Sequence, residues 1–248
     1  MDVALGLLAF WPALALGSFV NVVAARVPLR RSVVQPRSAC MACRSELAWY
    51  DNVPVLSYLL LRGRCRSCGV RISPLYPAVE LATAGLVAAC FVVFGLSGEA
   101  AVAAFFCAVL VAVTATDLTH RIVPNRIVLP AAVIVLLAQT ALYPSPEWAI
   151  GALGAAGFLF AAALAYPAGM GMGDVKLALL LGAMLGRLVA VGLMLGMVAA
   201  LIPSAVLLAR HGSAARKMGI PFAPFLAFGA VVALFVGKPL LDAYLSTF

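Results

Sequence analysis

The chain has 248 residues, of which 65% are hydrophobic and only 10% are charged, and its mean hydropathy is +1.11. A soluble globular domain carries about a quarter charged residues, so this composition excludes one and indicates a polytopic membrane protein. The net charge of +8 is compatible with nucleic-acid binding, but we expect it to reflect membrane topology instead.

Uncharged apolar stretches mark the predicted membrane spans. Lipid requires them to be helices, because their backbone polar groups must be satisfied internally. A crossing helix needs about 20 residues. Seven of the apolar stretches are long enough to cross. An eighth, at 177–186, is shorter and reaches only about half the hydrocarbon thickness. The sequence therefore predicts an all-α polytopic membrane protein with about eight transmembrane helices, at 3–25, 81–98, 100–116, 127–146, 148–173, 177–186, 188–209 and 218–237.

The positions of the basic residues predict the orientation of these helices. Nine arginines lie in the loop 26–73. Six more basic residues lie in the turn 120–126, at Lys176 and in the loop 210–217. If the short segment crosses the membrane, fifteen of the seventeen basic residues lie on one side, which is then cytoplasmic. We therefore expect both termini outside, and the acid at position 2 predicts no removable signal peptide.

Small residues recur along two of the apolar stretches. Gly151, Gly154 and Gly157 are three residues apart, and Gly182 and Gly186 are four apart. Because small residues let helix backbones approach closely in membranes, we interpret these glycines as packing positions.

The main hydrophilic segment contains two C-x-x-C pairs, Cys40 with Cys43 and Cys65 with Cys68. The 21 residues between the pairs match the spacing of a four-thiolate zinc site. Two disulfides are the competing interpretation, which a reducing cytoplasm disfavours. We expect a tetrahedral, closed and therefore structural Zn²⁺ site, which would fold a cytoplasmic loop too polar to form a core.

The nine arginines around these cysteines are consistent with anchoring to anionic lipid, or with contact to a peptide or cofactor. No reading helix or dense aromatic platform accompanies them, so we expect no nucleic-acid partner. Glu80 follows this loop. One interpretation is that Glu80 is an acid at a helix N-terminus, where the helix dipole favours it. The other is that it contacts a cationic substrate group or takes part in the methyl transfer introduced below.

Two acids interrupt the ends of apolar runs on the same predicted side. Asp117 ends one run and Asp174 begins another, within Gly171-Met172-Gly173-Asp174-Val175-Lys176. Two nearby carboxylates share a proton, so that one can activate water while the other polarises a carbonyl. The pattern predicts aspartic-protease chemistry, with glycines that permit close approach of a peptide. Lys176 either orients the pair or reaches lipid phosphates.

Taken together, these motifs resemble the type IV prepilin peptidases, a family of bifunctional leader peptidases and N-methyltransferases. The resemblance covers nearly the whole chain and depends on the order of its motifs. Besides the two cysteine pairs, the matching segments are 17–28, 51–58, 61–65, 76–81, the G-x-G-D-x-K signature at 171–176, and 220–226.

The resemblance implies a membrane aspartic endopeptidase of the bacterial inner membrane with Asp117 and Asp174 as catalytic residues and Gly171, Gly173 and Lys176 in support. It implies cleavage of prepilin or pseudopilin leaders after a glycine on the cytoplasmic side, then N-methylation with S-adenosylmethionine. The zinc loop and Glu80 belong to the half associated with methylation. One departure is Asn125, where the family often has Asp.

This interpretation divides the chain into a methylation-associated region at 1–98, a peptidase domain at 100–210 and a C-terminal loop and span at 211–248. Its partners would be the prepilin substrate and membrane lipids. Three alternatives stay open. A presenilin-like intramembrane protease shares the G-x-G-D motif, a proton-coupled transporter would use the acids as proton carriers, and a membrane anchor would leave them idle.

Overall fold

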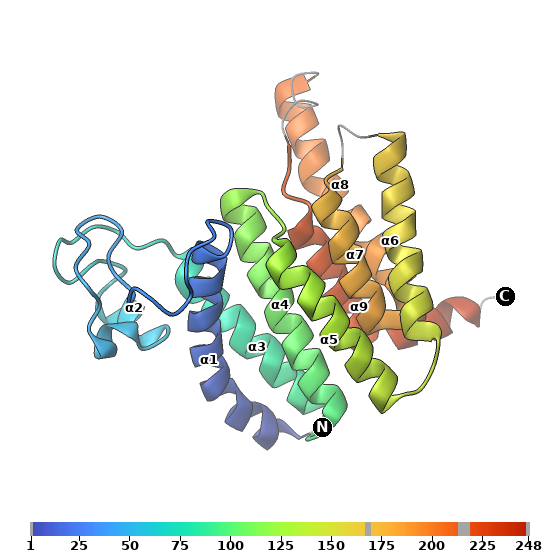
Figure 1. The fold of residues 1–248 in the computed structure, drawn as a ribbon, viewed down its shortest axis with the longest axis horizontal. Helices are drawn as coiled ribbons and strands as arrows, with labels where there is room; N and C mark the ends of the chain where they lie inside the picture. The colour runs from blue at the N-terminus through green and yellow to red at the C-terminus, as the bar shows by residue number, and fades with distance from the viewer. Residues whose placement is uncertain (1, 167–169, 213–218, 247–248) are drawn as a thin grey trace. The chain divides into compact units, whose positions relative to one another are not determined.

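The computed structural model describes residues 2–166, 170–212 and 219–246, and it is all-α there, with two isolated β-bridges as the only extended pairing (Figure 1). The predicted fold class is confirmed. The helices are α1 (Val3–Arg26), α2 (Leu56–Leu60), α3 (Leu75–Phe94), α4 (Gly98–His120), α5 (Asn125–Leu142), α6 (Glu147–Ala165), α7 (Met172–Leu185), α8 (Val189–His211) and α9 (Ala223–Leu245), with 3₁₀ turns η1 (Trp49–Asn52) and η2 (Gly186–Leu188).

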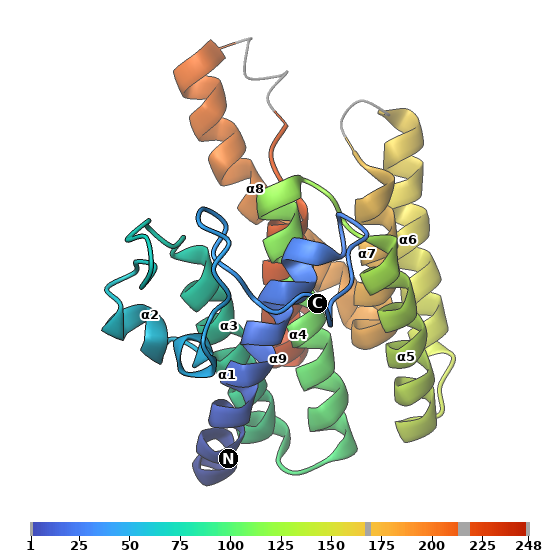
Figure 2. The same ribbon diagram turned by 60° about the vertical axis from the view of Figure 1, so that its left-hand side comes forward.

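Seven helical stretches among the described residues are long and apolar enough to cross a membrane, one fewer than predicted. The difference lies at Met172–Arg210, which counts as one stretch of 39 residues although it contains α7, η2 and α8. Both views show α7 and α8 running in opposite directions from the turn at η2 (Figures 1 and 2). The short predicted segment is therefore a separate helix, α7, of 14 residues.

Several predicted boundaries were wrong. The last span, predicted at 218–237, is α9 at Ala223–Leu245, which continues past Lys238. The bounds of α4 and α5, predicted at 100–116 and 127–146, are Gly98–His120 and Asn125–Leu142. Helix α3 begins at Leu75 instead of 81, because Glu80 is buried inside the helix with its carboxylate hydrogen-bonded. Helix α7 begins at Met172 instead of 177, since acids are favourable in a first turn, and Lys176 is bonded there rather than lying in a loop. Helix α6 ends at Ala165 instead of 173, next to a proline at 167 that disfavours helical backbone before it.

The structure divides into two compact units, Met1–Thr116 and Asp117–Phe248, with the boundary inside α4. In the first unit α1 packs along α3. Gly17 makes this close approach possible, because a Cβ there would lie 2.6 Å from the Cα of Glu80. One core cluster of this unit is made of small and β-branched side chains: Val20, Ala24, Val79, Val111, Ala112 and Ala115.

In the second unit α7 packs against α5 and α6, and α8 packs against α9. The predicted glycine packing is confirmed at Gly151 and Gly182, because a Cβ on Gly182 would overlap the carbonyl of Gly151. It is also confirmed at Gly186, which contacts Glu147. It is wrong at Gly154 and Gly157, where an added Cβ would meet nothing within 4 Å.

Candidate aspartic site and zinc loop

Asp117 lies in the last turn of α4 and is 6% exposed. Its Oδ2 accepts a hydrogen bond of 3.1 Å from the backbone N–H of Ala223, the first residue of α9. The end of one membrane helix and the start of another therefore fix the orientation of this carboxylate.

Asp174 lies in the first turn of α7, where its negative charge is favoured by the helix dipole. The chain enters this helix from Gly171, whose carbonyl accepts a hydrogen bond of 3.1 Å from the Asp174 N–H. The carboxylates of Asp117 and Asp174 interact electrostatically, and Asp174 is the more exposed of the two. Two acids that are 57 positions apart in the sequence thus share one site.

The two glycines of the G-x-G-D motif have different surroundings. A Cβ on Gly173 would lie 2.8 Å from the Cβ of Val123, in the segment that follows α4, so only glycine fits. A Cβ on Gly171 would lie 3.6 Å from Oδ2 of Asp174, an ordinary contact, and its φ of −82° suits any residue. Of the two, Gly173 carries the steric requirement.

Lys176 is tied to the start of α5. Its Nζ donates a hydrogen bond of 2.9 Å to Oδ1 of Asn125. Together with the contact of Gly173 on Val123, this bond holds the segment that follows Asp117 against the helix that carries Asp174.

The four cysteines of the loop in the first unit meet at one point. Their Sγ atoms all lie within 4.8 Å of one another, and those of Cys40 and Cys68 are 3.8 Å apart. Tetrahedral zinc with Zn–S bonds of about 2.3 Å separates two sulfurs by about 3.8 Å. The donor set and its spacing therefore fit a Zn²⁺ ion, and the thiols are not paired as disulfides.

The two C-x-x-C pairs sit in two knuckles of the same design. In each, the residue before the first cysteine pairs with the residue three positions after the second through an isolated antiparallel bridge. These pairs are Ala39 with Glu46, and Arg64 with Arg71.

The residue after the second cysteine also plays the same part in both knuckles. Arg44 and Gly69 have φ of +58° and +69°, and their N–H groups donate 2.9 Å hydrogen bonds to the carbonyls of Cys40 and Cys65. The first knuckle therefore uses an arginine in a conformation that favours glycine.

The thiols differ in acidity. Hydrogen bonds from Ser45 lower the pKa of Cys43 to about 6, and backbone N–H groups of the second knuckle lower the pKa of Cys65. Although a backbone hydrogen bond from Val70 acts in the opposite direction, desolvation and the neighbouring thiols raise the pKa of Cys68 to about 11. A divalent cation would be needed to keep all four sulfurs ionised at neutral pH.

Glu80 is 8% exposed and joins three elements of the first unit. Its Oε2 accepts a 2.8 Å hydrogen bond from the N–H of Val55, a β-branched residue with φ of +60° at the start of α2. Its carboxylate also interacts with Ser18 and Asn21 of α1. Glu80 thus holds the loop against the paired helices.

Sequence reasoning did not identify the partners that hold the aspartates. Ala223 acts through its backbone N–H, which no residue-type pattern reveals, although it lies inside the matching segment 220–226. Val123 contributes the shape of its side chain, which packs against Gly173. Asn125 contributes a side-chain oxygen that accepts a hydrogen bond from Lys176. The departure from Asp at position 125 was a signal that could have pointed to this contact.

Two family models match parts of this chain. The Bacterial Peptidase A24 N-terminal domain matches residues 12–94, and the Type IV leader peptidase family matches residues 104–235. No solved structure matches.

Three relatives are each named prepilin leader peptidase/N-methyltransferase. The protein of Bacillus subtilis is 40% identical over 240 residues, covering 94% of each chain. That of Burkholderia pseudomallei is 36% identical, covering 91% of this chain and 84% of its own. That of Aeromonas hydrophila is 33% identical, covering 97% and 94%. The chain therefore belongs to the type IV leader peptidase family.

Proposed function

We propose that this multi-pass membrane protein is an aspartic endopeptidase that removes the basic leader of type IV prepilins or type II secretion pseudopilins, and that Asp117 and Asp174 are its catalytic residues. One observation carries the proposal: the two carboxylates interact at one site in a family of leader peptidases. Asp117 is held by the Ala223 N–H, and Asp174 opens the short helix α7.

In this mechanism the two carboxylates share one proton. The ionised member takes a proton from a water molecule, which attacks the scissile carbonyl, and the protonated member polarises the carbonyl oxygen. The proton then passes to the leaving amine. Because the Ala223 N–H and the first turn of α7 hold the two groups in place, little reorganisation is needed when the peptide arrives.

We propose that cleavage occurs at a Gly–Phe type junction on the cytoplasmic side of the inner membrane, with both chain termini outside. The asymmetry of the basic residues supports this orientation. Two of the basic residues counted there, Arg216 and Lys217, lie outside the described residues.

We further propose that the same protein methylates the new N-terminus with S-adenosylmethionine, as the names of its relatives suggest. Cys40, Cys43, Cys65 and Cys68 would hold a structural Zn²⁺ that folds the loop. Glu80 would serve methyl transfer by holding this loop on α1 and α3 through Val55.

The test is cleavage of a peptide that spans a prepilin leader and the mature N-terminus, with S-adenosylmethionine present and products read by mass spectrometry. Wild type should cut before the first mature residue and add a methyl group. Asp117→Asn and Asp174→Asn should each abolish cleavage, whereas Asp2→Asn, an exposed acid at the chain start, should not.

The outcomes separate the alternatives. Cleavage lost in only one aspartate variant would refute the shared mechanism. Cleavage without methylation would leave a peptidase only. Failure with several prepilin peptides, together with cleavage inside a transmembrane substrate, would favour the presenilin-like protease. Failure with every peptide would favour the proton-coupled transporter or the anchor.

A further inference from the structure

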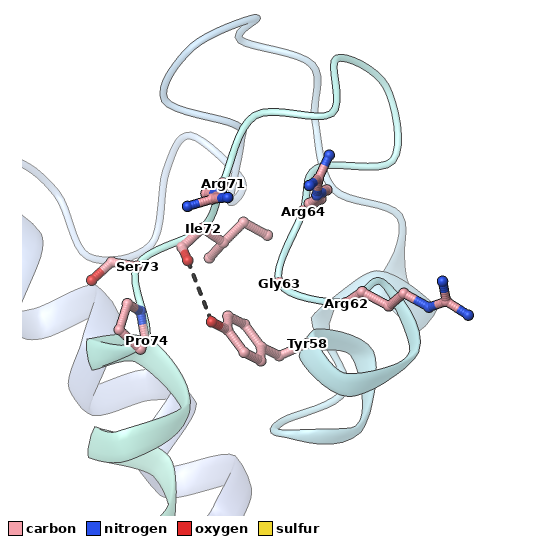
Figure 3. A pocket seen from close by; sticks show the side chains of 8 residues that line it. All are labelled: Tyr58, Arg62, Gly63, Arg64, Arg71, Ile72, Ser73 and Pro74. Atoms are coloured by element: carbon pink, nitrogen blue, oxygen red, sulfur yellow. Dashed lines mark hydrogen bonds between the residues drawn. The ribbon is translucent and has the colours of Figure 1, made fainter.

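A pocket in the second knuckle is lined by arginines and by no acid. It has a volume of about 600 Å³, lies within the first unit between α2 and the start of α3, and includes Arg62, Arg64 and Arg71 (Figure 3). The Tyr58 hydroxyl donates to the Ile72 carbonyl at 3.5 Å on its inner side. In Figure 3 Arg64 and Arg71 lie above the Tyr58 ring, while Arg62 points outward.

Arg64 and Arg71 are held opposite each other. They form the isolated antiparallel bridge, flanked by backbone hydrogen bonds from Cys65 to Val70 at 2.9 Å and from Ile72 to Gly63 at 2.8 Å. In such a pair the two side chains leave the same face, about 5 Å apart at Cβ, where like charges repel.

The repulsion is specific to this knuckle. The equivalent bridge in the first knuckle pairs Ala39 with Glu46 and brings no like charges together. Among the described residues, no carboxylate lies within ion-pair distance of Arg64 or Arg71, although the neighbouring Arg66 is paired with Asp51 at 2.7 Å. The bridge therefore places two arginines that lack a carboxylate partner on the same face, an arrangement that suits one anion with several oxygen acceptors.

The place of this pocket in the fold indicates which class of anion would reach it. Its wall includes Ser73 and Pro74, and the membrane-spanning helix α3 begins at the next residue. Helix α2, which precedes Arg62, exposes its leucines, with Leu59 and Leu60 exposed by 65% and 73%. Free arginines beside exposed leucines at the start of a span are suited to the boundary between headgroups and acyl chains.

We propose that Arg64 and Arg71 bind the phosphate of an anionic phospholipid headgroup, and that this contact seats the zinc loop on the membrane surface. The occupied site replaces repulsion between the two arginines with charge-assisted hydrogen bonds to one phosphate. Arg62, which points outward, contributes less. A cationic peptide is disfavoured by the charge of the pocket. The proposal needs the chain to be a membrane protein but does not depend on the peptidase activity.

Hydrogen–deuterium exchange of the full chain in nanodiscs tests it. The discs contain phosphatidylcholine alone or with about one third phosphatidylglycerol, and a third sample contains phosphatidylcholine with added inorganic phosphate. Phosphatidylglycerol should slow exchange across residues 62–73, and phosphate should not. A titration of the phosphatidylglycerol fraction gives the apparent affinity of each variant.

The pocket pair is the variant Arg64→Gln/Arg71→Gln, and the control pair is the variant Arg30→Gln/Arg31→Gln. The control pair removes the same amount of charge from two exposed arginines just beyond the end of α1, outside the pocket. The pocket pair should bind phosphatidylglycerol about tenfold more weakly than the control pair. Its thermal midpoint in pure phosphatidylcholine should not fall, because its repulsion is gone. Arg64→Lys/Arg71→Lys should weaken binding while keeping the charge, since lysine cannot form the two-pronged contact.

Equal losses in the pocket and control pairs would show diffuse attraction and overturn the proposal. Slowed exchange with inorganic phosphate alone would overturn it in favour of a soluble phosphate ligand. No change with phosphatidylglycerol would also overturn it. If Arg64→Gln/Arg71→Gln unfolds, Arg64→Lys/Arg71→Lys provides the test. A folded lysine variant that binds phosphatidylglycerol like wild type would refute the two-pronged contact.

Discussion

The two glycines of the G-x-G-D motif should respond differently to alanine. In Gly173→Ala the new methyl would lie 2.8 Å from Cβ of Val123, so the segment after Asp117 or the start of α7 must shift. Overpacking of this kind costs about 1–3 kcal/mol. The methyl recovers up to about 1 kcal/mol of helix propensity, and with the full recovery the net loss is about 0–2 kcal/mol. Because Asp174 is the next residue, cleavage should fall as well.

Gly171→Ala is the matched control, since its new Cβ makes only an ordinary contact at 3.6 Å. Gly171 is the N-cap of α7, where alanine is less favourable than glycine, so the variant's stability should fall by up to about 1 kcal/mol without a clash. The assays are the thermal midpoint in detergent and the cleavage rate of a prepilin peptide.

A second substitution in the Gly173→Ala background tests the contact itself. The atom in the way is Cβ of Val123, so Val123→Gly should restore activity to Gly173→Ala and Val123→Ala should not. If Gly173→Ala behaves like wild type, or if both second substitutions rescue it equally, the steric argument is wrong.

Three further predictions concern the knuckles and the lysine tether. Arg44→Gly should stabilise the loop by about 1 kcal/mol, measured as a higher thermal midpoint, because φ of +58° is costly for arginine; an unchanged midpoint would contradict this. Lys176→Met should lower cleavage, whereas Asn125→Asp should keep it and add up to about 1 kcal/mol through an ion pair; equal behaviour of both would refute the tether. In chelator-treated protein at neutral pH, Cys43, whose lowered pKa leaves it ionised, should be alkylated before Cys68, whose raised pKa keeps it protonated; mass spectrometry showing the reverse order would contradict this.

Much of the peptidase half could be predicted from residue types. Ionisable groups are costly in lipid, so Asp117 and Asp174 stood out from their apolar surroundings, and their matching depth predicted that they would meet. The groups that orient them could not be predicted. A backbone N–H on Ala223 and the shape of Val123 depend on how helices pack, which a single sequence does not encode as a local pattern.

The errors have physical causes as well. Helix boundaries were placed where charge begins, but a buried acid such as Glu80 can lie inside a helix when its carboxylate is hydrogen-bonded. Glycine spacing predicted packing at Gly154 and Gly157, where the helix face is open. The four-cysteine cluster was predictable because two C-x-x-C pairs are a strong local signal. The repulsive pairing of Arg64 and Arg71 was not, because it depends on the fold of the second knuckle.

The 14 residues of α7 have a consequence for the choice of lipid. At 1.5 Å per residue the helix rises about 21 Å, about 9 Å less than the hydrocarbon layer of a typical bilayer. Nine of its residues are buried against neighbouring helices, so if α7 crosses the membrane the mismatch is met at its ends, where headgroups and water follow the helix inward. Asp174 lies in the first turn of α7, so this mismatch would bring water to the carboxylate that we propose is catalytic. The acyl chain length of the surrounding lipid would then affect the rate of cleavage.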